Sequence, residues 1–119
     1  MSTPKTVLVT GGNRGIGLAS AQLLADQGHR VAITARDPEP IDDRILSVSC
    51  DQTDPSAVES AFGTIEAELG SVEVLVANAG ITRDQLLVRM SDEDFSEVIE
   101  TNLTGSYRMA RRAARTMLR

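Results

Sequence analysis

The amino-acid sequence predicts an α/β protein built on a doubly wound parallel sheet. Short runs of aliphatic and β-branched residues alternate along the chain with longer segments whose apolar residues recur at helical spacing. A glycine-rich turn at residues 11–17 separates the first run from the first helical segment. Because parallel strands need long crossover connections, this alternation favours a parallel sheet over a set of hairpins.

Four short apolar runs are expected to form the strands, at residues 6–10, 31–34, 45–49 and 72–77. The first run is continuously apolar at its centre, which is typical of a strand that is buried on both faces. The third run alternates between apolar and polar residues, so we expect it near an edge of the sheet. Between the second and third runs, Asp37-Pro38-Glu39-Pro40 is expected to be a loop.

Three longer segments are expected to be helices, and the first of them covers residues 15–27. Asp54 and Pro55 are a typical N-cap and first residue for the second helix, and Ser91 with Asp94 has the pattern of a capping box for the third. Helical spacing predicts the following inward-facing residues: Ile16, Ala19, Leu23 and Leu24 in the first helix, Val58, Phe62, Ile65 and Leu69 in the second, and Phe95, Val98, Ile99, Leu103, Ala110, Ala113 and Met117 in the third.

Length and composition limit the possible functions. A chain of 119 residues with 41% apolar residues is expected to fold as one domain, residues 1–119. The formal net charge of −5 argues against a nucleic-acid-binding protein, and the apolar runs are far shorter than the ~20 residues of a membrane span. One cysteine, Cys50, and a polar amino-terminal segment indicate a reducing, cytoplasmic location.

Five arginines crowd the last part of the chain. We expect them to lie on a solvated helix face, with an acidic partner surface as the alternative. They are Arg108, Arg111, Arg112, Arg115 and Arg119.

The glycine-rich turn has the position of a phosphate-binding loop. Gly11 allows a tight turn after the first strand, Gly15 lets the backbone approach a pyrophosphate, and Gly17 lets the helix pack against the sheet. The amino end of the helix then offers N–H groups and a positive dipole to phosphates. The spacing Gly-x-x-x-Gly-x-Gly is neither the common Gly-x-Gly-x-x-Gly nor a P-loop. A purely structural turn is the alternative interpretation.

Four motifs, taken in order, resemble those of the short-chain dehydrogenase/reductase family. Residues 10–17 are similar to its Thr-Gly-x-x-x-Gly-x-Gly signature, residues 78–80 to its Asn-Ala-Gly motif, Asp51 to its adenine-contacting aspartate, and Asn102 to the asparagine of its catalytic tetrad. The resemblance implies a Rossmann-type sheet of order 3-2-1-4, incomplete because the family sheet has seven strands. It places Asn102 in the catalytic site and implies these cofactor-binding residues: Gly11, Asn13, Arg14, Gly15, Ile16, Gly17, Arg36, Asp51, Gln52, Asn78, Ala79 and Gly80. No metal is expected, because the acidic residues of the chain do not have the spacing of metal ligands.

The end of the second strand indicates which nicotinamide cofactor is bound. An acidic residue there accepts hydrogen bonds from the ribose of NAD, whereas an arginine accommodates the 2′-phosphate of NADP. This chain has Arg36 at that point, and Arg14 in the glycine loop is expected to reach the same phosphate. Two guanidinium groups favour NADPH/NADP⁺. Two alternatives stay open, namely that the arginines are solvated surface charges, or that Asp37 meets a ribose instead.

The stretch at residues 78–90 resembles 3-oxoacyl-[acyl-carrier-protein] reductases within this family. That resemblance implies NADPH-dependent reduction of a 3-oxoacyl thioester to the 3-hydroxyacyl form in fatty-acid elongation. The implied partners are a thioester substrate on acyl-carrier-protein or CoA, and further copies of the chain in a dimer or tetramer that forms through the last helix. The alternatives are a non-catalytic NADP-binding or subunit-pairing module, and a short-chain reductase of another carbonyl substrate.

The catalytic residues of the family are only partly matched. In the family a serine and a tyrosine contact the carbonyl, and a lysine follows the tyrosine at the fourth position. Tyr107 is followed at that position by Arg111, and the single lysine, Lys5, precedes the first strand. We therefore expect a cofactor-binding domain truncated before the family's Ser and Tyr-x-x-x-Lys region and inactive alone. Tyr107 is expected to pack in the core or at an interface.

Overall fold

The computed structural model describes residues 3–81 and 87–118. Part of the stretch that resembles the reductases, residues 82–86, lies outside the described residues, as does Arg119. The helices and strands are, in chain order, β1 (Thr6–Thr10), α1 (Gly15–Asp26), β2 (Arg30–Ala35), β3 (Ile45–Ser49), α2 (Pro55–Leu69), β4 (Val74–Ala77), the 3-10 turn η1 (Leu87–Arg89), α3 (Asp92–Val98), the π-helical turn η2 (Ile99–Thr104) and α4 (Gly105–Met117).

The strands form a parallel sheet in the order β3-β2-β1-β4, which confirms the predicted class and strand order. β1 is central, and its Val7 is in register with Val31 of β2 on one side and with Val74 of β4 on the other. β3 is an edge strand, as its alternating sequence predicts. The predicted bounds of β1 and β3 are confirmed, whereas β2 is longer than expected and β4 begins at Val74 rather than at residue 72.

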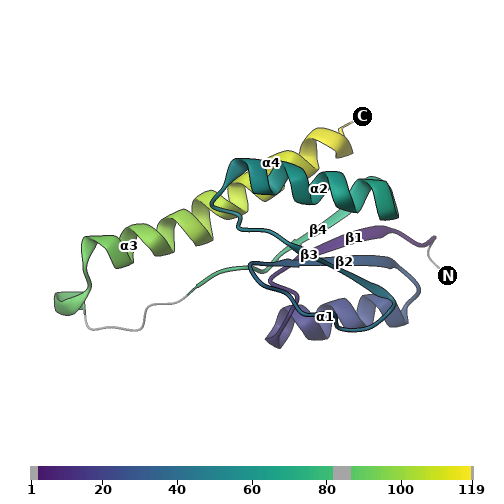
Figure 1. Cartoon of the computed structure of the whole chain (residues 1–119), viewed down its shortest axis with the longest axis horizontal. Helices are drawn as coiled ribbons and strands as arrows, with labels where there is room; N and C mark the ends of the chain where they lie inside the picture. The colour runs from purple at the N-terminus through teal and green to yellow at the C-terminus, as the bar shows by residue number, and fades with distance from the viewer. Residues whose placement is uncertain (1–2, 82–86, 119) are drawn as a thin grey trace.

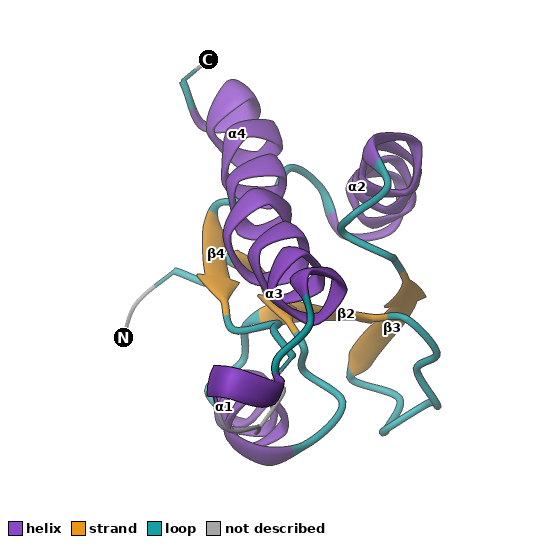
Figure 2. Ribbon diagram, turned by 90° about the vertical axis from the view of Figure 1, so that its left-hand side faces the viewer, coloured by secondary structure: helices purple, strands orange, loops and turns teal. Residues whose placement is uncertain are grey.

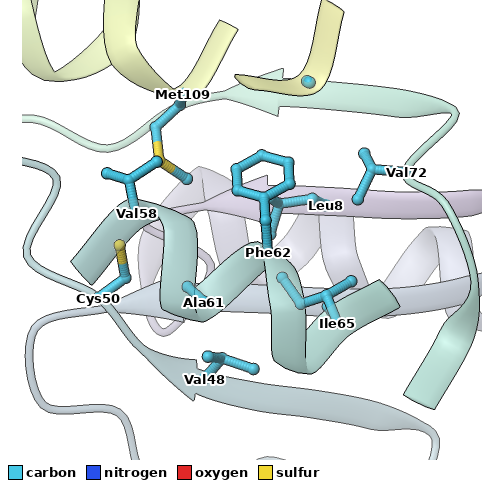
Figure 3. Packing of buried hydrophobic residues seen from close by; sticks show 11 residues of the cluster. Leu8, Val48, Cys50, Val58, Ala61, Phe62, Ile65, Val72 and Met109 are labelled. Atoms are coloured by element: carbon cyan, nitrogen blue, oxygen red, sulfur yellow. The ribbon is translucent and has the colours of Figure 1, made fainter. Parts of the chain in front are cut away.

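Helices cover both faces of the sheet, with α1 on one side and α2 and α4 on the other (Figures 1 and 2). Leu8 of β1 faces α2 and α4 and packs in one cluster with Phe62 and Met109 (Figure 3). Val7 and Val9 face the opposite way and belong to the cluster beneath α1. Successive strand residues point to opposite faces. A central strand covered on both sides therefore buries all its residues, which explains the continuous apolar run.

Side-chain caps fix the amino ends of α2 and α3. Asp54 Oδ1 accepts a hydrogen bond from the N–H of Ser56 at 3.0 Å, and Pro55 occupies the first turn. Ser91 Oγ accepts one from the N–H of Asp94, also at 3.0 Å. Both predicted N-caps are confirmed, and so is the inward face of α2, where Val58, Phe62 and Ile65 are buried and Leu69 is partly buried.

The inward face predicted for α1 is wrong. Ile16 is 79% exposed, Leu23 is 57% exposed, and Ala19 is exposed too, while Leu24 is only partly buried. The buried residues are instead small ones at every fourth position: Gly17, Ala21 and Ala25. A Cβ atom on Gly17 would lie 2.3 Å from the carbonyl oxygen of Gly11, so the helix runs too close to the sheet and glycine loop for large side chains to fit between.

The inward face predicted for the last helical segment is also mostly wrong. The buried positions are Thr101, Gly105, Met109 and Ala113. Figure 1 gives the physical reason for α3, which extends well beyond the sheet, so that no helix or strand of the described residues lies beneath it. Of the expected inward residues, Ala113 is buried, Val98 is partly buried, and the exposed ones are Phe95, Ile99, Leu103, Ala110 and Met117. Tyr107 is 57% exposed, which excludes packing in the core of this chain and leaves the interface as the prediction.

Two arginines of α4, Arg108 and Arg112, join that helix to the loop after β3 and to α2, which corrects the expectation of a solvated face for these two, whereas Arg111 and Arg115 are exposed as expected. Arg112 is 12% exposed in its side chain and hydrogen-bonds to Glu59 and Glu66 of α2. Arg108 donates to the carbonyl oxygen of Thr53 at 2.9 Å. No helix among the described residues has both the length and the apolar character needed to cross a membrane.

Candidate cofactor-binding site

A cavity of about 570 Å³ opens at the carboxyl ends of β1, β2 and β4, beside the amino end of α1. Parallel α/β sheets bind their ligands at this end of the strands. The cavity gathers most of the predicted site residues, namely Gly11, Asn13, Arg14, Gly15, Ile16, Arg36, Gln52, Asn78, Ala79 and Gly80. Of the predicted residues, all of which are described, Gly17, Asp51 and Asn102 are not part of its lining.

The glycine loop has the conformation that its spacing predicts. Gly11 and Gly15 have positive φ angles of 66° and 56°, which side chains disfavour. A Cβ on Gly11 would lie 2.8 Å from Cα of Ala79, whereas a Cβ on Gly15 would meet no atom within 4 Å. Gly11 therefore allows two loops to touch, and Gly15 leaves open space beside the backbone.

The amino end of α1 has no acidic group to neutralise it. Arg14 is the N-cap residue, and an arginine side chain cannot accept a hydrogen bond from helix N–H groups. The first turn of the helix, Gly15-Ile16-Gly17, contains no acidic residue. Since the first N–H groups of a helix have no intrahelical acceptor, this end is suited to an anion.

A buried hydroxyl that the sequence analysis missed holds the second loop of the site. Thr10 Oγ1 accepts hydrogen bonds from the N–H groups of Asn78 at 2.9 Å and Ala79 at 3.0 Å. The side-chain amide of Asn78 reaches back to the carbonyl oxygen of Gly11 at 3.3 Å. The signal was available, because threonine is the first residue of the glycine signature, but its role becomes visible only when the two loops are brought together.

Charged groups line the rim of the cavity next to β2. Arg14, Arg36 and Asp37 all contribute to the lining. Arg36 Nε lies 3.8 Å from Asp51 Oδ1. Asp51 itself accepts hydrogen bonds from the side chain and the N–H of Thr53, which, together with the charge of Arg36, hold the pKa of its carboxyl below its usual value. Asp51 stands behind Arg36 rather than in the cavity wall.

Cys50 and Gln52 line the wall between β3 and the π-helical turn. Burial, and then the charges of Asp51 and Asp54, raise the pKa of the Cys50 thiol to about 11, which leaves it protonated and unreactive at neutral pH. Gln52 Nε2 donates to the carbonyl oxygen of Thr101 at 2.7 Å, so its side-chain amide is already engaged within the chain.

Asn102 lies in η2 and pairs with the backbone of the loop after β4. Its Oδ1 accepts from the N–H of Ile81 at 2.7 Å, and its Nδ2 donates to the carbonyl oxygen of Ile81 at 2.8 Å. Ile81 lines the cavity. Asn102 thus acts on the cavity wall through a neighbour, and π-helical turns of this kind are frequent at functional sites.

The sequence predicted Asp37 only as an alternative ribose contact, and it did not predict five other residues of the lining. Most of the five lie at or just after the carboxyl end of a strand, where the topology alone predicts ligand contact. They are Thr34, Ala35, Cys50, Ile81 and Thr101. The described residues bring no three His, Cys, Asp or Glu side chains together as a metal site.

Residues 5–119 match the sequence family described as short chain dehydrogenase. The chain is 55% identical over 113 residues to 3-oxoacyl-[acyl-carrier-protein] reductase MabA of Mycobacterium avium, which covers 95% of this chain and 44% of that protein. It is 43% identical over 122 residues to 3-oxoacyl-[acyl-carrier-protein] reductase FabG of Escherichia coli (strain K12), covering 97% of this chain and 50% of that protein. The chain therefore spans about half the length of the curated relatives it matches. With the glycine loop, the Asn-Ala-Gly turn and the parallel sheet in place, it belongs to the short chain dehydrogenase family.

Proposed function

We propose that this chain is the cofactor-binding part of an NADPH-dependent 3-oxoacyl thioester reductase. The observation that carries the proposal is the cavity at the amino end of α1, where Gly15 leaves open space beside a helix end that has no acidic residue. A dinucleotide's pyrophosphate is the anion that such a helix end suits in an α/β sheet.

The residues of the cavity fit a nicotinamide dinucleotide. In this proposal Gly11, Gly15 and Ile16, which line the cavity, hold the pyrophosphate, and Asn78 to Gly80 form the facing loop. Arg14 and Arg36 supply two guanidinium groups at the rim, which suit the 2′-phosphate of NADP. Asp37 shares that rim, so NADP is proposed over NAD on the excess of positive charge.

The substrate follows from the relatives, whose printed names describe reductases of 3-oxoacyl groups on acyl-carrier-protein. The bound cofactor would supply a hydride to the 3-oxo group, giving the 3-hydroxyacyl thioester of fatty-acid elongation. The carrier in this proposal is acyl-carrier-protein or CoA. In this chain Asn102 holds Ile81 in the cavity wall, and we include Asn102 in the catalytic site.

Reduction of a ketone needs a proton donor for the developing alkoxide, and we do not propose Tyr107 for that role. Among the described residues that line the cavity, neither Tyr107 nor Lys5 is present. Lys5 instead pairs with Glu73, at the amino end of the strands. We therefore expect residues 1–119 to bind NADPH without reducing a ketone, and a non-catalytic NADP-binding or subunit-pairing module remains the second candidate.

The same proposal includes a homo-oligomer, a dimer or tetramer, that forms through the last helix. Phe95, Leu103 and Tyr107 are 59%, 66% and 57% exposed and recur at multiples of four residues along α3, η2 and α4. Apolar side chains gathered in one exposed patch mark interaction sites. The proposal also includes a cytoplasmic location, because a single cysteine is typical of proteins in a reducing compartment.

A matched pair of glycine variants tests the cofactor proposal. Gly15 and Gly28 both have positive φ angles, 56° and 91°, and a Cβ on either would meet no atom within 4 Å. Both changes to alanine therefore strain the backbone, Gly28→Ala at least as much as Gly15→Ala, but Gly28 lies at the far end of α1. Titration of NADPH, followed by its fluorescence, should show saturable binding that Gly15→Ala weakens and Gly28→Ala does not. Absence of saturable binding by the unchanged chain, or equal losses in both variants, would refute the proposal.

A further inference from the structure

The side chain of Gln52 is buried against the π-helical turn. It is 7% exposed, and its Nε2 lies 2.7 Å from the carbonyl oxygen of Thr101. A buried amide that donates to a carbonyl at this distance makes a well-formed hydrogen bond. Gln52 thereby joins the loop after β3 to η2, two parts of the chain that are 49 residues apart in sequence.

Gly105 provides the room for this contact. Its φ of −62° is an ordinary helical value, so the backbone conformation itself does not require glycine. A Cβ at this position, however, would lie 2.6 Å from Cγ and 2.7 Å from Nε2 of Gln52. The first residue of α4 thus accommodates Gln52 by lacking a side chain.

A second tie holds the same loop from α4. Arg108 Nη1 donates to the carbonyl oxygens of Gln52 at 3.3 Å and Thr53 at 2.9 Å, and to Glu100 Oε1 at 2.8 Å. Arg108 fixes the backbone at Gln52, and that in turn directs the Gln52 side chain toward Thr101. The hydrogen bond between Gln52 and Thr101 is therefore supported by Arg108 at the Gln52 backbone and by the space at Gly105.

The bond to Thr101 falls one residue before Asn102, the residue that pairs with both backbone groups of Ile81. A π-helical turn replaces the usual hydrogen-bond spacing, as the Gly105 N–H to Glu100 carbonyl bond shows, and such turns are less stable than α-helix. An external donor on the Thr101 carbonyl stabilises this arrangement. Thr101 and Ile81 both line the cavity, so the chain of contacts ends at its wall.

We propose that Gln52 is a positioning residue, which holds the π-helical turn through Thr101 so that Asn102 fixes Ile81 in the cavity wall. Its side chain lines the cavity, but its Nε2 is engaged by the Thr101 carbonyl, so it acts by holding η2 rather than by a bond to the cofactor. The inference rests on the proposed function only in taking the cavity as the cofactor site, and it makes a prediction for the ligand-free chain as well.

Amide hydrogen exchange in the ligand-free chain tests the proposal at single residues. Gln52→Met keeps the size of the side chain and removes the donor. The N–H of Ile81, held by Asn102, should exchange about fivefold faster in this variant, the effect of losing one net hydrogen bond. The N–H groups of Asn78 and Ala79 should keep their rates, because they are held by Thr10 on β1.

Two further variants keep the test decisive. Gln22→Met makes the same chemical change at an exposed position of α1 and should leave Ile81 unchanged. Gly105→Ala should accelerate Ile81 like Gln52→Met, because the new Cβ displaces the Gln52 side chain. Unchanged exchange at Ile81 in both Gln52→Met and Gly105→Ala, or equal acceleration at Ile81, Asn78 and Ala79, would overturn the proposal.

Cofactor affinity separates this inference from the proposed function. If the unchanged chain binds NADPH, Gln52→Met should raise its Kd severalfold while Gln22→Met leaves it unchanged. If the unchanged chain does not bind NADPH, the proposed function fails, but the exchange rate of Ile81 still decides the role of Gln52.

Discussion

Thr10 Oγ1 and the N–H of Asn78 lie 2.9 Å apart, and this hydroxyl also accepts from Ala79. Thr10→Val preserves the shape of the side chain but leaves two N–H groups without their acceptor. We expect the free energy of unfolding, measured with urea, to fall by about 1 kcal/mol, the usual net value of a hydrogen bond, because the two N–H groups are only partly buried. NADPH should also bind more weakly, because the loop faces the cavity. Thr10→Ser keeps the accepting oxygen and should retain most of the stability and most of the affinity for NADPH.

Thr6 provides the control, since it is a buried threonine at the opposite end of the same strand. Its Oγ1 donates to the carbonyl oxygen of Leu69 at 2.9 Å and accepts from Arg30. Thr6→Val should lower the free energy of unfolding by a comparable amount without changing the Kd for NADPH. If both variants weaken NADPH binding equally, the effect of Thr10 is one of global stability and the assignment of a loop-holding role is wrong.

Arg36 should decide between NADPH and NADH. The substitution Arg36→Asp removes a guanidinium from the rim of the cavity and adds a carboxylate, which repels a 2′-phosphate. We expect the Kd for NADPH to rise about 10- to 100-fold, the range for a hydrogen bond to a charged group. The Kd for NADH should change far less. Fluorescence titrations with both cofactors measure this, and equal losses would mean that Arg36 does not read the phosphate.

Asp37 adds a check on the same rim. Asp37→Ala should strengthen NADPH binding if Arg36 and Arg14 contact the phosphate, because a nearby negative charge is removed. If Asp37 instead accepts hydrogen bonds from a ribose, the variant should lose affinity for NADH. The sign of the change therefore distinguishes the two arrangements that the sequence leaves open.

Strands were more predictable than helix faces, and the reason is physical. The run at residues 6–10 is apolar because both sides of β1 are covered, so its bounds follow from hydropathy alone. On α1 the same reasoning fails. Large apolar residues such as Leu23 are exposed, and the contact with the sheet is made by Gly17 and Ala21. Where a helix backbone approaches a sheet closely, only small residues fit between them. The spacing of large apolar side chains therefore does not predict which face of such a helix is buried.

The site shows the same division. The glycine loop and the residues after each strand could be placed from sequence, because topology brings the carboxyl ends of parallel strands together. The roles of Gln52 and Asn102 could not, since each depends on a partner far away in sequence, Thr101 and Ile81. The π-helical turn that aligns them changes the helical phase by a local hydrogen-bond shift, for which the sequence contains no pattern.

Arg112 should contribute more to stability than Arg115, another arginine of α4. It hydrogen-bonds Glu66 at 2.5 Å and Glu59 at 2.7 Å, and its guanidinium lies 5.0 Å from the ring centroid of Phe62. Arg112→Met leaves the partly buried Glu66 without these bonds, and the free energy of unfolding should fall by about 2–4 kcal/mol. Arg115, whose side chain is 60% exposed, is the matched control. Arg115→Met should cost roughly 1 kcal/mol or less, and equal losses would contradict this account.

Cys50 should make stability fall in alkaline solution. Its pKa is raised from 9.0 to about 11, chiefly by burial, so the unfolded chain releases a proton that the folded chain retains. The stabilising effect is complete below pH 9 and is lost as the pH rises toward 11. The free energy of unfolding should therefore decline by about 2–3 kcal/mol over that window from this group. Urea unfolding at pH 8 and near pH 11 measures the decline.

Cys50→Ala isolates the thiol from the tyrosine, lysine and arginine groups that also titrate in alkaline solution. The small cavity that the change creates lowers stability by the same amount at each pH, so only the slope carries the information. A shallower decline in the variant than in the unchanged chain supports the retained proton. Parallel declines would mean that the thiol ionises as readily in the folded chain as in the unfolded one. Slow reaction of the folded chain with iodoacetamide at pH 8 should accompany the steeper slope, because the reacting species is the thiolate.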